Sequence, residues 1–247
     1  ISQPLADLIA TGLSYSEATQ GAFDIAIAPL TSLWNFTAEN PIPPEYSAIH
    51  TALSSCGYQH VNLQDRIITF DSPDIQIDLG AVAKGYIADR IKEYLVSQGV
   101  ESGIINLGGN VLCIGKKPDG TPFKIGIQKP FADRNETEAI MDITNKSVVS
   151  SGIYERCFQY NGKSYHHILN PKTGYPYQNG LISVTIVCEQ SVMGDALSTS
   201  CFALGLEDGL TYAESLDNVQ AVFITDDYEM HYTKGFQKEI PVTDTKN

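Results

Sequence analysis

The sequence predicts an α+β protein in which a mostly antiparallel sheet is packed against helices. Short alternating runs of apolar residues gather in the middle and at the end of the chain, and helical patterns stand apart from them instead of alternating strictly with single strands. With 247 residues, 43% of them hydrophobic, the chain can bury a sizeable core. We therefore expect one large domain or two intimate lobes.

Two helices are expected in the first part of the chain. The first is indicated by apolar residues at helical spacing, namely Leu5, Leu8, Ile9 and Leu13. The second lies in PPEYSAIHTALSSCG, which starts at prolines and stops at Gly57, the positions that these residues prefer.

The next segments pass from strands to a long helix. HVNLQDRIITF (60–70) predicts a hairpin, and IQIDLG (75–80) predicts a short strand. AVAKGYIADRIKEYLVSQG (81–99) predicts a helix that ends at Gly99. Its apolar face is expected to consist of Ile87, Ile91, Tyr94 and Leu95.

Most of the sheet is predicted after residue 102. Alternating runs are separated by turn residues, including the hairpin signal Asn161-Gly162. These runs are GIINLGG, NVLCIG, FKIGIQ, EAIMDI, SVVSSG, YERCFQY and SYHHIL. LISVTIVC adds a strand before a buried helix at 191–205, and VQAVFIT with EMHY closes the chain.

The amino-acid composition narrows the classes of molecule that the protein is expected to bind. Sixteen Lys and Arg against 29 Asp and Glu give a net charge of −13, which argues against nucleic acid. No run approaches the roughly 18 apolar residues of a membrane span. The five cysteines are far apart and mostly flanked by apolar residues, so we interpret them as core thiols rather than a disulfide framework or a zinc site.

The segment SVMGDALSTSCFALG places Asp195 and Thr199 one helical turn apart on one stripe of a buried helix. Carboxylate and hydroxyl oxygens are ligands that suit Mg²⁺, which usually takes few ligands from the protein. The alternative is that Asp195 caps its own helix and the Thr199 hydroxyl bonds back to the Asp195 carbonyl.

Four stretches with more glycine, polar and charged residues than the hydrophobic pattern needs could also carry chemistry: DLGAVAKG (78–85), NLGGN (106–110), SSGIYER (150–156) and HHILNPKTGYP (166–176). DLGAVAKG (78–85) turns from a strand into a helix, whose exposed amides and Lys84 could hold a phosphate, although Lys84 could equally be a solvated lysine. Gly108 and Gly109 either allow close approach to a ligand or form a plain turn. In HHILNPKTGYP the two histidines should point to opposite faces, and one of them is a candidate for acid–base chemistry.

Six motifs in order resemble the FAD:protein FMN transferases, the ApbE family of flavin transferases. They are TQGAFDIAIAPLTSLWNF (19–36), IDLGAVAKGYIADRI, NLGGNV, SVVSSGIYER, YHHILNPKTGYP and GDALSTSCFALG. The resemblance implies a T-fold-like architecture and a Mg²⁺-dependent enzyme. Such an enzyme cleaves FAD, passes FMN to a threonine or serine hydroxyl of an acceptor protein, and releases AMP.

The resemblance also implies the roles of particular residues. The metal would be held by the Asp195 carboxylate, the Thr199 hydroxyl and the main-chain carbonyl of Ala81. His167 would be the general base and, with Asp195, a catalytic residue. The residues that would bind FAD are Ala22, Phe23, Asp24, Asp78, Lys84, Ser151, Gly152, His167 and Ile168.

Several positions depart from the family pattern. Ala26 and Ala28 stand where the family carries threonine and glycine, Ile153 replaces an aspartate, and Asn170 replaces the aspartate of an IDP motif. Residues 1–247 are expected to form a single catalytic domain that lacks part of the family's N-terminal region. Family members are often lipoproteins, which implies an extracytoplasmic, membrane-anchored enzyme.

Two other functions fit the same residues. One is a Mg²⁺-dependent FAD pyrophosphatase that yields FMN and AMP, and the other is a protein that binds FAD without turnover. AMP release from FAD and Mg²⁺ would exclude the second, and an acceptor protein would separate transfer from hydrolysis.

Overall fold

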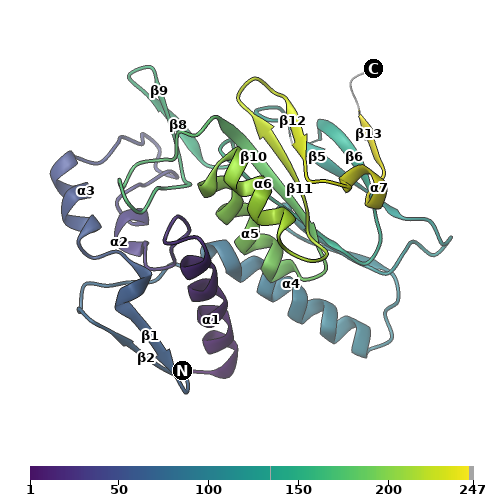
Figure 1. Cartoon of the computed structure of the whole chain (residues 1–247), viewed down its shortest axis with the longest axis horizontal. Coiled ribbons are helices and arrows are strands. Elements are labelled where there is room, and N and C mark those ends of the chain that lie inside the picture. Colours follow the sequence, from purple (N-terminus) through teal and green to yellow (C-terminus); the bar gives the residue numbers. More distant parts are fainter. Residues whose placement is uncertain (134, 245–247) are drawn as a thin grey trace. The chain divides into compact units, whose positions relative to one another are not determined.

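The computed structural model describes residues 1–133 and 135–244 and divides into two compact units (Figure 1). The first unit comprises Ile1–Val82 and Ile153–Asn179, and the second comprises Ala83–Gly152 and the chain from Gly180 onward. The boundary between residues 82 and 83 falls inside helix α4 (Gly80–Ser97). Helices and antiparallel sheets are both present, so the α+β class is confirmed.

The first unit combines short helices with two hairpins. Its elements are α1 (Gln3–Ala18), α2 (Ala28–Thr31), α3 (Tyr46–Leu53), the 3₁₀ turn η1 (Tyr58–His60), β1 (Val61–Gln64), β2 (Ile67–Phe70), β8 (Cys157–Tyr160) and β9 (Lys163–His166). One core cluster gathers Leu30, Trp34, Ile49, Phe158 and Leu169. The indole Nε1 of Trp34 donates to the carbonyl of Gly174 (2.8 Å), which ties this core to the loop after β9.

The second unit is built on a six-stranded sheet in the order β12-β11-β10-β7-β4-β3, with every neighbouring pair antiparallel. These strands are β3 (Gly103–Leu107), β4 (Asn110–Ile114), β7 (Ser147–Gly152), β10 (Leu181–Cys188), β11 (Gln220–Thr225) and β12 (Met230–Tyr232). A second sheet has the order β13-β6-β5, from β5 (Phe123–Gln128), β6 (Thr137–Ile143) and β13 (Val242–Asp244).

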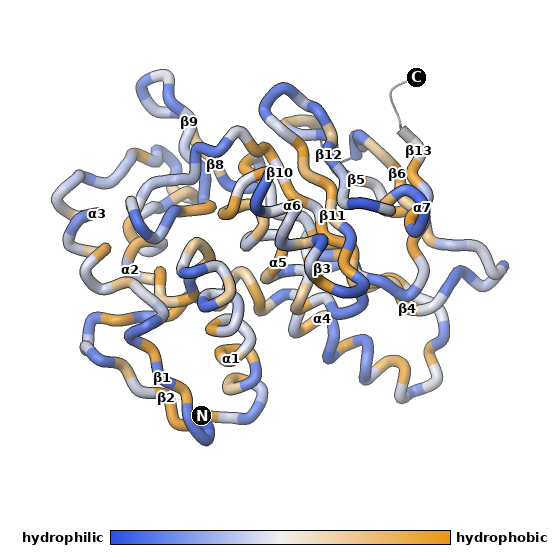
Figure 2. Tube along the Cα trace, viewed as in Figure 1, coloured by the Kyte–Doolittle hydropathy of each residue, from blue (hydrophilic) through white to orange (hydrophobic). Residues whose placement is uncertain are grey.

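Strand β10 is the centre of this core, because all eight of its residues are buried. It and β11 are among the most hydrophobic strands in Figure 2. Helix α5 (Ser191–Leu204) packs on β10 and β7, and α6 (Leu206–Glu214) packs on α5. A Cβ on Gly194 would lie 2.7 Å from the side chain of Val149, so only glycine lets α5 approach β7 this closely.

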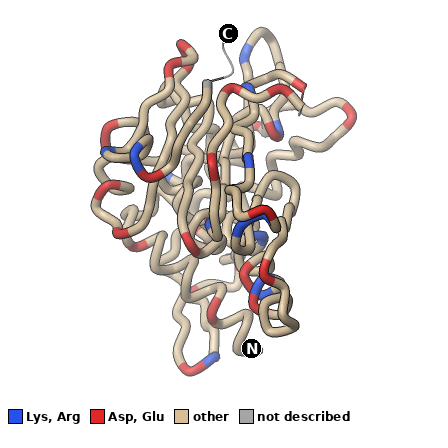
Figure 3. The backbone as a smooth tube through the Cα atoms, turned by 90° about the vertical axis from the view of Figure 1, so that its right-hand side faces the viewer, with Lys and Arg blue, Asp and Glu red and all other residues tan. Residues whose placement is uncertain are grey.

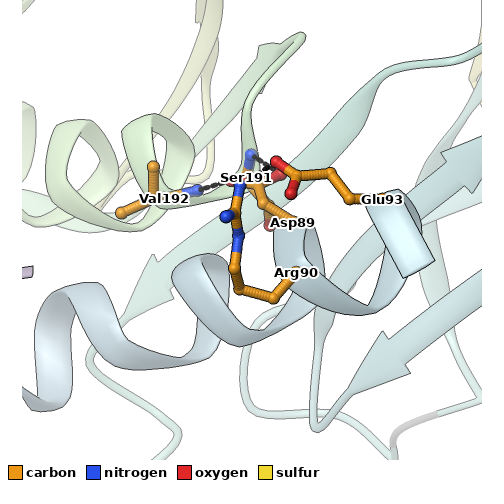
Figure 4. Close-up of polar contacts among 5 residues, drawn as sticks. All are labelled: Asp89, Arg90, Glu93, Ser191 and Val192. Carbon is orange, nitrogen blue, oxygen red and sulfur yellow. Dashed lines mark hydrogen bonds and ion pairs between the residues drawn. The ribbon is translucent and has the colours of Figure 1, made fainter. Parts of the chain in front are cut away.

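Helix α4 crosses the start of α5 at two positions one turn apart. A Cβ on Gly85 would lie 2.2 Å from the carbonyl oxygen of Ser191, so the contact requires glycine. The Asp89 carboxylate accepts the amides of Ser191 (2.8 Å) and Val192 (2.9 Å), as Figure 4 shows. Because Gln190 makes no side-chain cap, Asp89 supplies the anion that the α5 N-terminus needs.

Charged residues are sparse on the strands and common in the loops. In Figure 3 most Asp and Glu residues lie in turns and helices, while the strands are largely uncharged. Within the part of the chain that is described, no helix is both long and apolar enough to cross a bilayer.

Several sequence predictions need correction. In α4, Ile91 and Leu95 pack on the core, but Ile87 and Tyr94 are 50% and 65% exposed, because Ala88 takes the central buried position. The segment 75–79 is not a strand: its Asp78 amide bonds to the Ile25 carbonyl in a loop (2.7 Å), with no ladder partner among the described residues.

Helix ends and short elements were also missed. Helix α3 begins at Tyr46, after the prolines instead of at them. No separate prediction covered α2, α6, α7 (Phe236–Glu239) or β13. The hairpin at 60–70 and the strands from 103 to 232 are confirmed.

Asp89→Ala should lower the free energy of unfolding by about 1–2 kcal/mol, because two amides at the α5 N-terminus lose a charged acceptor. Glu93→Ala is the matched control: Glu93 is one turn along the same helix and forms only an exposed ion pair with Arg90 (Figure 4). Its loss should stay within about 0.5 kcal/mol. Urea unfolding measures both, and equal losses would contradict the capping role of Asp89.

Candidate active site

Helix α5 presents a cluster of oxygen atoms to strand β7. The hydroxyl of Ser151 on β7 lies 2.8 Å from that of Ser198 and 3.1 Å from that of Thr199. Asp195 is one turn before Thr199 on the same helix and is only 4% exposed. The structure thus groups three of the predicted site residues, Asp195, Thr199 and Ser151, in the second unit; Gly152 follows Ser151 on β7.

The Asp195 carboxylate is held by neutral donors from two other elements. The side-chain amide of Asn110, at the start of β4, donates to Oδ1 (2.9 Å), and the backbone amide of Gly85 in α4 donates to Oδ2. Burial raises the pKa of Asp195, while these two hydrogen bonds and the charge of Lys84 act to lower it. The donors favour the ionised carboxylate because it accepts more hydrogen bonds than the protonated form.

The capping alternative for Asp195 is not what the structure shows. Asp195 lies in the second turn of α5, and the amides of the first turn are bonded by Asp89. The hydroxyl that bonds to the Asp195 carbonyl is that of Ser198 (3.0 Å), whereas the Thr199 hydroxyl contacts Ser151. Asp195 therefore has no capping role in α5.

The donor set of this cluster fits a hard cation. A carboxylate and two hydroxyls are oxygen ligands of the kind that Mg²⁺ binds, together with water and substrate phosphates. Among the described residues, no three His, Cys, Asp or Glu side chains gather as a metal centre. Ala81, the predicted carbonyl ligand, lies in the first turn of α4. In a regular helix its carbonyl would accept the Gly85 amide, which here donates to Asp195.

Two carboxylates of the first unit that are predicted to bind FAD accept hydrogen bonds from backbone amides. Asp78 accepts the Gly80 amide (2.8 Å) with one oxygen and the Thr31 hydroxyl (3.0 Å) with the other, at the start of α4. Asp24 is 8% exposed and accepts the amides of Ala26 (2.7 Å) and Tyr58 (2.9 Å). Burial raises the pKa of Asp24, against the effect of these amides.

The remaining residues predicted to bind FAD in the first unit are largely buried. The side chains of Phe23 and Ile168 are 4% and 5% exposed, and the Ala22 carbonyl accepts the Tyr177 hydroxyl (2.8 Å). Phe23 and Ile168 are thus core residues as well as predicted site residues. Lys84, in the second unit, is half-buried near the start of α4.

The two neighbouring histidines have different environments. His166 is 6% exposed; its Nε2 contacts the Tyr177 carbonyl (2.8 Å) and its Nδ1 accepts the Ile168 amide (3.3 Å). Burial lowers the pKa of His166, and its two backbone contacts identify it as a structural residue. His167 follows β9, is half-buried, and its backbone amide donates to the Arg156 carbonyl (3.1 Å).

The double glycine forms a turn, as one of the two sequence interpretations holds. Gly108 and Gly109 both have positive φ (64° and 99°) between paired residues Leu107 and Asn110, and nothing lies within 4 Å of a Cβ built on either. The NLGGN stretch was predicted to carry chemistry through these glycines, and no role was assigned to its last residue, Asn110. A polar residue at the start of an apolar strand was the available signal.

Comparisons with known proteins agree with the motifs. The ApbE family model matches residues 1–223. A FAD:protein FMN transferase from Klebsiella pneumoniae (strain 342) is 39% identical over 91% of this chain and 70% of its own length. One from Treponema pallidum (strain Nichols) is 30% identical over 100% of this chain and 72% of its own length.

Solved structures share the fold. The ApbE protein of Thermotoga maritima has a TM-score of 0.87 and 32% identity, covering 96% of this chain and 78% of its own. The apo form of the Pseudomonas stutzeri flavinyl transferase ApbE has a TM-score of 0.83 and 30% identity, covering 96% and 75%. Since the family model and these relatives span most of the chain, and six motifs occur in the family's order, the chain belongs to the ApbE family.

Proposed function

We propose that this protein is a Mg²⁺-dependent FAD:protein FMN transferase. It cleaves the pyrophosphate of FAD, joins FMN to a threonine or serine hydroxyl of an acceptor protein, and releases AMP. The observation that carries the proposal is the buried Asp195 carboxylate, kept in place by neutral donors one helical turn before Thr199, whose hydroxyl contacts that of Ser151. Relatives named FAD:protein FMN transferase support the substrate.

Asp195, Thr199 and the carbonyl of Ala81 are the residues that would hold Mg²⁺. When bound, Mg²⁺ would offset negative charge on the pyrophosphate. Asp195 would bring one negative charge to the ion, whereas the hydroxyl and the carbonyl are neutral ligands. The ion together with Asp195 would therefore keep a net positive charge, which attracts the phosphate oxygens.

Residues at the start of α4 are proposed to bind the phosphates of FAD. The first amides of a helix have no partner within the helix and carry the positive end of its dipole. The Asp78 carboxylate takes the Gly80 amide and so fixes the entry into α4. Lys84 follows within the first turns, and its ammonium adds charge where negative charge develops on the leaving AMP.

His167 is proposed to act as general base. In transfer, the acceptor oxygen forms a bond to the FMN phosphorus, the phosphorus–oxygen bond to AMP breaks, and the hydroxyl proton passes to the imidazole of His167. AMP leaves with the electron pair of the broken bond. His166 is unsuited to this role because both of its ring nitrogens contact backbone groups.

Hydrolysis of FAD is the second candidate, because water could replace the acceptor hydroxyl at the same phosphorus. The deciding experiment supplies FAD, Mg²⁺ and a candidate acceptor protein, and measures AMP together with FMN bound covalently to the acceptor. Covalent flavin in equal amount to AMP supports transfer. Free FMN and AMP with or without acceptor would support the pyrophosphatase, and absence of AMP under all conditions would contradict both.

Asp195→Ala should abolish Mg²⁺-dependent AMP release, and Thr199→Ala should reduce it less severely, since the ion would keep a carboxylate. Thr199→Ser is the matched control because it retains the hydroxyl. Asp195→Ala leaves two buried donors without their acceptor, at a cost of about 1–3 kcal/mol, so folding is checked by circular dichroism. Full activity of a folded Asp195→Ala protein at low millimolar Mg²⁺ would refute the metal assignment.

His167→Asn should bind FAD with nearly normal affinity and lose FMN transfer by about 10²–10⁴-fold, the usual contribution of a general base. The control is His60→Asn, since His60 is exposed in the same unit and its ring contacts Asp71 on the surface. Its transfer rate should stay within a few-fold of wild type. His166→Ala serves poorly as a control because it removes two buried hydrogen bonds. Normal transfer by His167→Asn would place the base elsewhere.

A further inference from the structure

We infer that Asn110 is the positioning residue that fixes the orientation of the Asp195 carboxylate, and that the NLGGN segment (106–110) serves to deliver it there. The inference rests on the proposed function, in which Asp195 binds the metal. Asn110 is 1% exposed, and both ends of its side-chain amide are hydrogen-bonded within the second unit.

Asn110 belongs to a chain of buried polar groups that ends at Asp195. The Ser147 hydroxyl donates to the Ser191 hydroxyl (2.9 Å), and Ser191 donates to Oδ1 of Asn110 (2.7 Å). Nδ2 of Asn110 then donates to Oδ1 of Asp195 (2.9 Å). Both serines are 0% exposed, so bulk water does not compete for these bonds.

The chemistry of these groups sets the direction of the hydrogen bonds from Ser191 to Asn110 and from Asn110 to Asp195. An ionised carboxylate can only accept, so the NH₂ end of the Asn110 amide must face Asp195. The carbonyl end must then face Ser191, whose hydroxyl has to donate. The Ser147 hydroxyl has two acceptors within reach, the Ser191 hydroxyl (2.9 Å) and the Val111 carbonyl (3.3 Å). Two successive donors thus point toward the carboxylate, and such bonds strengthen one another in a low-dielectric interior.

The turn before β4 fixes the position of Asn110. Leu107 and Asn110 close the β3–β4 hairpin, and the positive φ angles of Gly108 and Gly109 suit a two-residue turn. The exposed Asn106 side chain accepts the Gly109 amide (3.0 Å) and completes the turn. Asn110 therefore stands directly after the turn, as the first residue of β4.

Two donors from different elements restrain Asp195. Asn110 reaches one carboxylate oxygen from β4, and the Gly85 amide reaches the other from α4. Each oxygen keeps a further lone pair for an ion. Without Asn110, the carboxylate would lose one restraint. The metal would then have to order the carboxylate as it binds, which lowers its affinity. Partners that orient a metal ligand typically change metal affinity by about 10–100-fold.

The test measures Mn²⁺ binding to the whole chain by the electron paramagnetic resonance signal of free Mn²⁺. Asn110→Leu, which keeps the approximate volume without donors, should weaken Mn²⁺ binding by about 10–100-fold. Ser191→Ala should give a smaller loss in the same direction, and it leaves the Ser191 backbone amide on Asp89. Asn62→Leu, the same change at an exposed asparagine of β1, should bind Mn²⁺ within about three-fold of wild type.

A second readout separates positioning from folding. At saturating Mg²⁺, Asn110→Leu should recover most of the wild-type maximal rate, because it retains Asp195; Asp195→Ala should not recover. Unchanged Mn²⁺ affinity in folded Asn110→Leu, or in Ser191→Ala if the first variant does not fold, would overturn the inference. If Asp195→Ala also binds Mn²⁺ normally, the metal assignment itself fails; if only Asp195→Ala loses the ion, the role of Asn110 alone fails.

Discussion

The close crossing of α4 and α5 is the constraint on which the geometry of the second unit depends. Gly85 lets the two helices meet at backbone distance, and Asp89, one turn further along α4, bonds the first two amides of α5. The same crossing brings the Gly85 amide to the carboxylate of Asp195. One contact therefore sets where α5 begins and how its acidic residue is held, so the fold and the candidate metal site share their determinants.

Neutral hydrogen-bond donors around a buried carboxylate explain how the site can exist before a cation arrives. A buried charge without partners is costly, and a fixed cationic partner would compete with the metal. Asn110 and the Gly85 amide avoid both problems, because they stabilise the ionised form without cancelling its charge. The charge of Lys84 also acts to lower the pKa of Asp195.

Local patterns predicted much of the fold and part of the site. Alternating apolar residues identified the strands from 103 to 232, and four-residue spacing paired Asp195 with Thr199. The exposed Ile87 and Tyr94 were wrongly assigned to a buried face, since several apolar stripes on α4 were compatible with its sequence. The roles of Asp89 and Asn110 were missed because their hydrogen-bond partners are 102 and 85 residues away in the sequence. The spacing of neighbouring residues does not reveal contacts of this kind.

The central claim is that α5 offers the Asp195 carboxylate and the Thr199 hydroxyl to one cation while neutral donors hold the carboxylate. A crystal structure grown with Mn²⁺ tests it most directly, through the position of the anomalous scattering peak. We expect the peak at about 2.1 Å from an Asp195 oxygen and from the Thr199 hydroxyl, with the Asn110 amide still bonded to Asp195. A Mn²⁺ ion bound elsewhere, with Asp195 contacting only protein donors, would contradict it.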